Sequence, residues 1–304
     1  MSGSLGHASL KGTDIVLLAF SEWNSLHFHL GFRPLGSTLG FISLSPSATR
    51  TMLQLARQLR ADVSQLDRRA VFALSYAAVG LTCISFLKNP DYLAALTVHT
   101  PFAGVGVEAA GPTDNNLYGL VWWVFVSVTF YFIVPALFVR FVQKRKLSEV
   151  GLAFRIESGF VKLFFQCIAI MLPLVYLMSL TSGFAAKYPF LKVYNGDPYL
   201  STTLLIWELF YFLQFFGLEF FFRGFLVHSL KPSLGAYSIF AMTVPYTMIH
   251  FQKPMAEAFA AIFAGIFLGW LSLKNGNIWM GLVLHCCVAF SMDILALYNK
   301  GLLF

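Results

Sequence analysis

The stretch FFGLEFFFRGF, residues 215–225, decides what kind of protein this chain is. Its Glu219 and Arg223 lie four residues apart, so a helix places them on one face, one turn along. The residues around them are aromatic or aliphatic, apart from two glycines. A single charged side chain costs roughly 2.5–3.5 kcal/mol to insert at the centre of a membrane helix. The pair is therefore either a structural ion pair that joins helices or part of a functional site.

The whole chain has the composition of a membrane protein. Its 304 residues have a mean hydropathy of +0.71, and only 12% of them are charged, whereas a soluble domain carries about 25%. The apolar runs are long and continuous rather than alternating, which is typical of membrane-spanning helices. We therefore expect an all-α, polytopic transmembrane bundle of about seven spans, within a range of roughly six to eight.

Seven apolar runs are long enough to be spans. They are roughly residues 70–87, 117–141, 159–180, 204–230, 236–251, 256–273 and 278–298. We expect Lys231-Pro232 to end the fourth run, and residues 88–116 to form a polar loop. The densest basic cluster, Lys144–Lys146, follows the second run. Together with Arg68-Arg69 it predicts a cytoplasmic N-terminus and, for an odd number of spans, an external C-terminus.

The first 69 residues form an N-terminal extension. Its residues 47–69 repeat apolar side chains at helical spacing with arginines between them. This pattern predicts a basic amphipathic helix that lies on the membrane surface or packs against the protein's own loops. The net charge of +7 otherwise comes from the short connections, which indicates orientation in the membrane rather than nucleic-acid binding. The four cysteines have neither a disulfide nor a zinc spacing, and no signal-peptide pattern is present.

Ionisable residues inside the last four runs are functional candidates by default. They are Glu208, Glu219, Arg223, His228, His250, Glu257, His285 and Asp293. At about 100° per residue, Glu208 and Glu219 lie within about 20° of each other on their helix. Tyr246 and His250 are four residues apart, so the phenol can flank the imidazole. We expect His228, considered alone, to be hydrogen-bonded to a neighbouring helix without a catalytic role.

A glutamate near two histidines is compatible with three chemistries. The first is general-base activation of water, with a second polar group that stabilises the oxyanion. The second is a His2Glu metal site of the kind found in zinc hydrolases. The third is a proton relay in a transporter. The chain contains no HExxH, no G-x-S-x-G and no P-loop motif, and the missing P-loop argues against an ATPase.

Three motifs in sequence order resemble those of the CPBP family, the CAAX proteases and bacteriocin-processing enzymes also called the Abi family. They are Leu218-Glu219-x-x-x-Arg223, Tyr246-x-x-x-His250 and His285-x-x-x-Ala289, and the segments 250–254 and 277–281 are also similar. The resemblance covers about residues 140–298. It implies an intramembrane endopeptidase in which the glutamate and the first histidine activate water, and the last histidine stabilises the oxyanion. The family has Glu where Leu218 stands and Asn where Ala289 stands.

The resemblance and the ionisable residues within the spans together predict a set of site residues. The catalytic residues would be Glu219, His250 and His285, and the supporting residues Arg223, Tyr246, Glu257 and Asp293. No cofactor is required, and a divalent metal such as zinc would be held by the three catalytic residues if a metal is used. Leu218 and Ala289 instead favour a second reading, a catalytically inactive family member that binds or scaffolds a membrane partner. The third reading is a transporter, but the chain shows no internal repeat.

The domain organisation follows from these assignments. Residues 1–69 are the extension, 70–141 two N-terminal transmembrane helices, and 142–304 a CPBP-like peptidase core. The expected partners are a membrane peptide or protein substrate and the lipid bilayer, with no nucleic acid. The expected location is the inner membrane of a bacterial cell.

Overall fold

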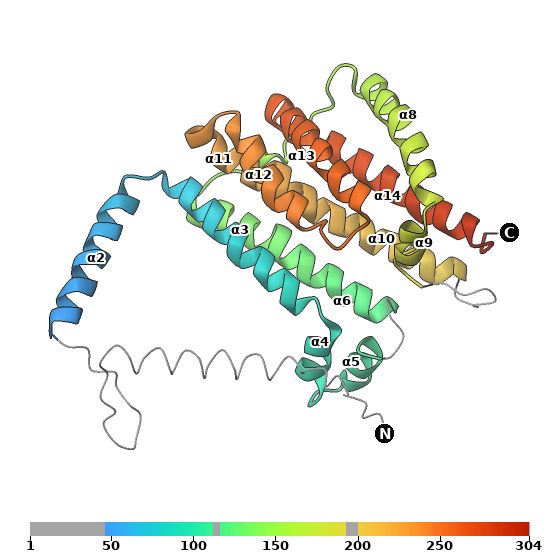
Figure 1. Cartoon of the computed structure of the whole chain (residues 1–304), viewed down its shortest axis with the longest axis horizontal. Coiled ribbons are helices and arrows are strands. Elements are labelled where there is room, and N and C mark those ends of the chain that lie inside the picture. The colour runs from blue at the N-terminus through green and yellow to red at the C-terminus, as the bar shows by residue number, and fades with distance from the viewer. Residues whose placement is uncertain (1–45, 112–115, 193–199, 304) are drawn as a thin grey trace, which may run out of the picture. The chain divides into compact units, whose positions relative to one another are not determined.

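The computed structural model describes residues 46–111, 116–192 and 200–303, and within these ranges the chain is helical with no strand (Figure 1). It divides into two units at residue 66. The first unit contributes helix α2, Pro46–Ser64, which covers most of the helix predicted at 47–69, whereas Arg68 and Arg69 begin the next helix. The position of α2 on a membrane surface stays a prediction.

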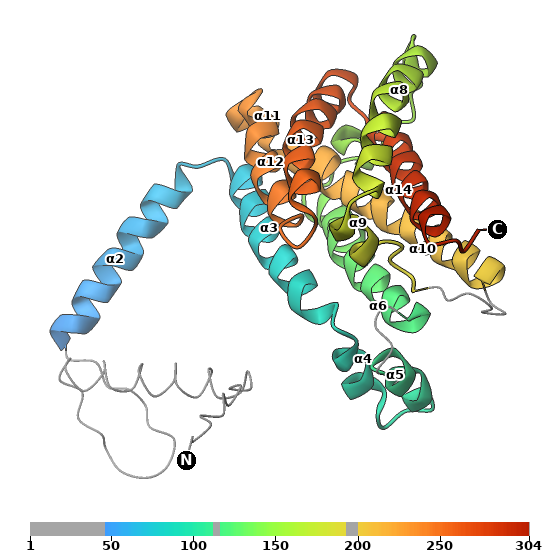
Figure 2. The ribbon, with the colours of Figure 1, turned by 45° about the vertical axis from the view of Figure 1, so that its right-hand side comes forward.

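The second unit is a helical bundle (Figure 2). In the described ranges, six helices are long and apolar enough to cross a membrane, so the chain is an integral membrane protein. Four of the spans are single helices: α3 (Arg68–Leu87), α8 (Phe160–Ser179), α13 (Met255–Asn275) and α14 (Trp279–Asn299). The second span is continuous through α6 (Leu117–Val128), η1 (Thr129–Ile133), α7 (Val134–Leu137) and η2 (Phe138–Val142). The fourth span is continuous through α10 (Leu200–Glu219), η4 (Phe220–Leu226) and α11 (Val227–Leu234). The shorter helices are α4 (Pro90–Thr97), α5 (Ala103–Ala109), η3 (Leu147–Val150), α9 (Ser182–Lys187) and α12 (Tyr237–Met248).

Helix α12 differs from the span expected at 236–251. It has 12 residues, about 18 Å of helix, against a hydrocarbon core about 30 Å thick. Pro245, which has no N–H to donate, lies in its last turn, and the chain then turns at 249–254 into α13, which packs along α12. His250 follows α12 and lines one cavity together with Gln214 and Leu218 of α10 and His285 of α14. The span expected at 236–251 would have placed it at the end of a full-length membrane helix.

Two further expectations at helix ends were wrong. Residues 88–116 contain α4 and α5, where a loop was expected. The side chain of Asn89 caps α4 by accepting a hydrogen bond from a backbone N–H, which is a favoured way to begin a helix. The fourth span runs past Pro232 to Leu234, because a proline near a helix end removes only one hydrogen bond. The left-handed φ of Gly235, +54°, ends it.

The stretch that decided the class lies at the centre of the bundle. Its segment η4 is π-helical, with i→i+5 hydrogen bonds, and every side chain in it is buried. A Cβ on Gly224 would lie 2.6 Å from the carbonyl oxygen of Val150, so only glycine allows this approach. Gly151, with φ +96°, faces Gly224 and accepts a 3.0 Å hydrogen bond from the N–H of Ile278. The start of α14 is thereby fixed beside the Glu–Arg motif.

Candidate active site

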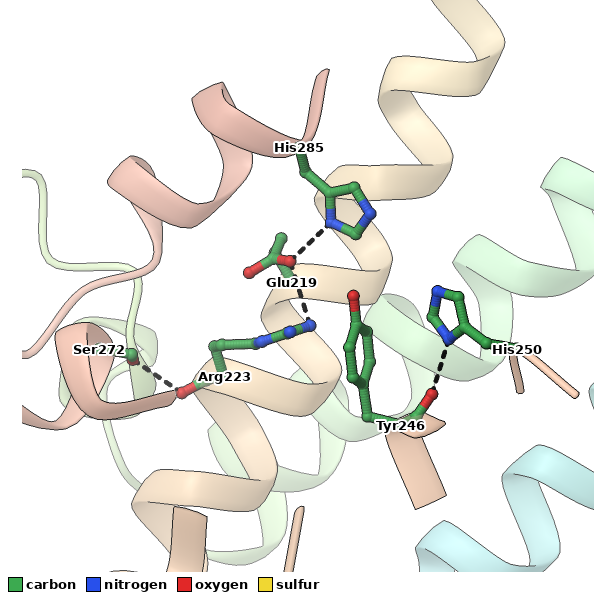
Figure 3. A network of polar contacts seen from close by, with 6 residues as sticks. All are labelled: Glu219, Arg223, Tyr246, His250, Ser272 and His285. Carbon is green, nitrogen blue, oxygen red and sulfur yellow. Dashed lines mark hydrogen bonds and ion pairs between the residues drawn. The ribbon is translucent and has the colours of Figure 1, made fainter. Parts of the chain in front are cut away.

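Glu219 is the centre of a polar cluster shared by α10, η4 and α14 (Figure 3). The side chain is 0% exposed. Its Oε1 lies 2.9 Å from Nδ1 of His285 and 3.1 Å from Nη1 of Arg223. Because a carboxylate can only accept hydrogen bonds, Nδ1 of His285 carries the proton. In the neutral ring, Nε2 of His285 then holds the lone pair.

Arg223 braces this cluster against two other helices. Its guanidinium carbon lies 3.7 Å from the ring centroid of Tyr246 on α12, which is cation–π geometry. Its carbonyl oxygen accepts a 2.8 Å hydrogen bond from Oγ of Ser272 on α13. The same Oγ lies 3.2 Å from Nε2 of His228, so His228 is bonded to a neighbouring helix as expected. The ion pair, the aromatic ring and the hydroxyl together hold η4 in place.

His250 is also held in one orientation. Its Nδ1 lies 2.8 Å from the carbonyl oxygen of Tyr246, which can only accept, so this nitrogen also carries the proton. The rings of Tyr246 and His250 lie 4.8 Å apart edge to face, as their four-residue spacing predicted. His285 is stacked on Phe215 at 4.3 Å. Each imidazole thus has one nitrogen occupied and the other available for a ligand (Figure 3).

Both histidines line one cavity of about 500 Å³ between α3, α6, α10 and the turn after α12. Leu218 lines it as well, whereas Glu219, about 100° further round the helix, points toward α14. A Cβ at Gly281 would lie 2.7 Å from Oε2 of Glu219, so Gly281 makes the room for that carboxylate. Among the described residues that line the cavity there is no Asp or Glu. Glu219 therefore acts on the cavity only through His285.

Asp293, one of the predicted supporting residues, lies in a separate cluster. One of its oxygens accepts a 3.4 Å hydrogen bond from Nε1 of Trp207, and the carboxyl lies against Glu208 on α10. Both carboxyls are buried, and the cavity lining includes neither. Glu208 and Glu219 do share a face toward α14, as predicted, but eleven residues of helix separate them by about 16 Å.

Glu257 lies at the edge of the cavity. Its carboxylate accepts a 2.6 Å hydrogen bond from Nζ of Lys253 and bonds with the hydroxyl of Tyr188 at 2.9 Å. Lys253 lines the cavity, and so does Lys88 at the end of α3. Burial lowers the pKa of Lys88, and the nearby Lys187 lowers it further. The rim of the cavity is therefore basic, and Glu257 positions one of its lysines.

Sequence reasoning did not include Gln214, which also lines the cavity. It lies one turn before Leu218 on α10 and is 4% exposed. Within the described ranges its Oε1 is buried without a hydrogen-bond partner. The sequence does show Gln214 as a polar side chain inside an apolar span. It was not among the candidates because these were limited to ionisable side chains, and an amide does not ionise.

The residues present do not fit the metal site that the sequence allowed. In the parts of the chain that the structure describes, no three His, Cys, Asp or Glu side chains are placed to hold a metal ion. Oε1 of Glu219 already faces His285 and Arg223, while His250 approaches the cavity from another side. We derive no metal-dependent step from this geometry, and metal dependence stays a prediction that a chelator control would test.

Comparison with known families connects this geometry to a function. Residues 200–291 match the model of a family described as type II CAAX prenyl endopeptidase Rce1-like. The match runs from α10 into α14 and includes Glu219, His250 and His285, which confirms over these residues the resemblance predicted from the motifs. Comparisons with curated proteins and with solved structures found no match.

Proposed function

Starting from this Rce1-like match, we propose that the chain is an intramembrane endopeptidase that hydrolyses a peptide bond of a membrane-associated peptide or protein. One observation carries the proposal. Two imidazoles, His250 and His285, line a single cavity inside the bundle, and each is fixed by a hydrogen bond at Nδ1. Such fixed groups can orient a water molecule and move its proton.

The geometry favours a different division of roles from the one expected from the sequence. Glu219 and His285 form a carboxylate–imidazole pair, so His285 is the general base and Glu219 its positioning residue. Nε2 of His285 takes a proton from water, and the water oxygen bonds to the carbonyl carbon of the substrate. The C–N bond then breaks, and Nε2 returns the proton to the leaving nitrogen. Nε2 of His250 accepts the second hydrogen of the water and holds it for attack.

Gln214 supplies the oxyanion contact in this proposal. The family's Asn position is Ala289, which packs among aromatic residues that include Trp207 and Tyr211. Gln214 lines the same cavity as the histidines, and its side-chain amide carries an NH₂ group that can donate. Removal of one oxyanion donor typically costs about 10²–10³ in kcat, so Gln214→Leu should lower kcat with little change in KM.

A second candidate function rests on Leu218. This side chain occupies the cavity position where the family carries its first glutamate, and the described lining of that cavity contains no carboxylate. A site without a carboxylate there would bind a peptide without cleaving it. The second candidate is therefore a catalytically inactive, peptide-binding relative. No feature of the residues that the structure describes favours the transporter reading.

One set of variants separates the two candidates. Purified full-length protein is incubated with a library of fluorogenic peptides, and cleavage is compared for wild type, Glu219→Gln, His250→Ala, His285→Ala and Leu218→Glu. For a peptidase, His285→Ala should lower kcat by about 10²–10⁴-fold, the usual contribution of a general base. Thermal unfolding of each variant in the same detergent shows whether the fold is kept.

Leu218→Glu gives the discriminating result. If wild type cleaves, the inactive reading is excluded. If wild type is inert and Leu218→Glu gains cleavage that His250→Ala abolishes, the chain is the binding relative. If both are inert to every peptide that the protein binds, the peptidase proposal fails. The inner membrane of a bacterial cell stays the proposed location, which membrane fractionation of the native cells would check.

A further inference from the structure

The cavity that holds the two histidines adjoins a second one. The second cavity has a volume of about 490 Å³ and shares lining residues with the first. The shared residues are Ser85, Lys88, Trp123, Phe190, Ile249, Gln252 and Lys253. The second cavity is also lined by the connection that contains α4 and α5, through Asp91 and Ala109 among others. The two neighbouring cavities therefore extend from His250 and His285 toward the end of the bundle where α3 ends and α6 begins.

Neither of these two cavities extends to the opposite end of the bundle. The connections there are residues 143–159, between η2 and α8, 235–236, between α11 and α12, and 276–278, between α13 and α14. Neither cavity is lined by any residue of these three connections. Gly224 and Gly151 pack closely near that end, because a Cβ on Gly151 would lie 2.8 Å from Cα of Gly224. We call this the closed end, and the end that the two cavities approach the open end.

Basic residues indicate which face this is. The closed end has four in the connection 143–159, namely Lys144, Arg145, Lys146 and Arg155. The open end has Lys88 in the connection 88–116, Lys187 and Lys192 in 180–199, Lys253 in the turn 249–254 and Lys300 after α14, which makes five spread over four segments, whereas the four at the closed end lie in one connection. Lysines and arginines concentrate in short loops on the cytoplasmic side. The charge distribution therefore places the closed end in the cytoplasm.

We infer that the substrate segment enters the site from the extracytoplasmic face of the membrane, along the trough between α4–α5 and the turn at 249–254. The substrate class is then peptides or protein segments that reach the membrane from outside the cytoplasm. That a peptide or protein segment enters the site rests on the proposed function. The face of the membrane from which it enters rests only on the position of the cavities and on the distribution of basic residues.

Cysteine labelling in intact cells tests the side of entry without any need for activity. The four native cysteines, Cys83, Cys167, Cys286 and Cys287, are first replaced by alanine in the full-length chain. Single cysteines are then introduced by Ser85→Cys and Gln252→Cys, two exposed positions among the shared lining residues. Ser148→Cys, exposed on the opposite connection, is the matched control.

A maleimide that cannot cross the cytoplasmic membrane is added before or after permeabilisation. We expect Ser85→Cys and Gln252→Cys to be labelled to the same extent in both conditions, and Ser148→Cys only after permeabilisation. The reverse pattern overturns the inference, as does absence of label at both lining positions in either condition. Labelling from outside in a protein that cleaves no peptide would leave this inference standing while the peptidase proposal fails.

Discussion

Two buried carboxylate clusters lie between the same pair of helices, α10 and α14, and they are built in opposite ways. Glu219 meets a guanidinium and an imidazole, whereas Glu208 meets a second carboxyl, Asp293. Only the first cluster reaches a cavity, through His285. An ionisable group inside a membrane span is therefore not enough to identify an active site. A side chain that connects the group to a cavity is what distinguishes the two clusters.

The largest expected effect comes from removing the cation of the first cluster. Arg223→Met leaves Glu219 buried without its countercharge, and breaking a buried pair in this way typically costs about 3–5 kcal/mol. Denaturant unfolding of the purified protein in detergent micelles measures the loss. The double variant Glu219→Gln with Arg223→Met should recover part of it, because the uncompensated charge is gone. A loss below about 1 kcal/mol would show that the cluster does not depend on this pair.

A smaller effect is expected from crowding the same carboxylate. Gly281→Ala places a Cβ 2.7 Å from Oε2 of Glu219, and such overpacking costs about 1–3 kcal/mol. The displaced carboxylate also loses its alignment with His285, so cleavage should fall more than stability does. Gly183→Ala in α9 is the control, since nothing lies within 4 Å of its added Cβ. Equal effects of the two variants would show that the contact with Glu219 has no consequence.

The smallest effect is expected in the second cluster. Asp293→Asn keeps the size of the side chain and an oxygen for Trp207, and it removes one of two adjacent carboxyls. We expect a change in unfolding free energy below about 1 kcal/mol and unchanged cleavage. Glu219→Gln is the matched substitution in the first cluster and should abolish cleavage. A comparable loss of activity in Asp293→Asn would make Asp293 part of the site, as the sequence suggested.

Hydropathy and charge were sufficient to predict the class of fold and most helices. Long apolar runs must be helical in a bilayer, because the backbone has no other hydrogen-bond partners there. The same reasoning made α12 too long, because it counts apolar residues and takes no account of Pro245 near the helix end. It also treated 88–116 as loop, where short helices form outside the spans.

The sequence indicated which residues lie together at the candidate site better than it indicated which of them contact one another. The four-residue spacings of Glu219–Arg223 and Tyr246–His250 correctly predicted a contact in each pair, although His250 lies in the turn after α12. Contacts between helices also depend on the position of each helix along its own axis. A helical wheel gives only the direction of each side chain around the axis, so it does not predict these contacts. Glu208 and Glu219 share a direction, yet the shift of α14 brings Asp293 to one and His285 to the other.

The π-helical segment η4 has a consequence for how this chain tolerates change in length. Each i→i+5 turn holds one residue more than an α-helical turn, so η4 rotates everything after it relative to everything before it. Glu219 can face α14 while Val227–Leu234 faces α3 and α12. If the same 7 residues adopted a regular α-helix, α11 would turn by about 100° relative to α10 and lose its facing toward α3 and α12. The π-helical segment is thus where the span accommodates one extra residue while the helices before and after it keep their neighbours.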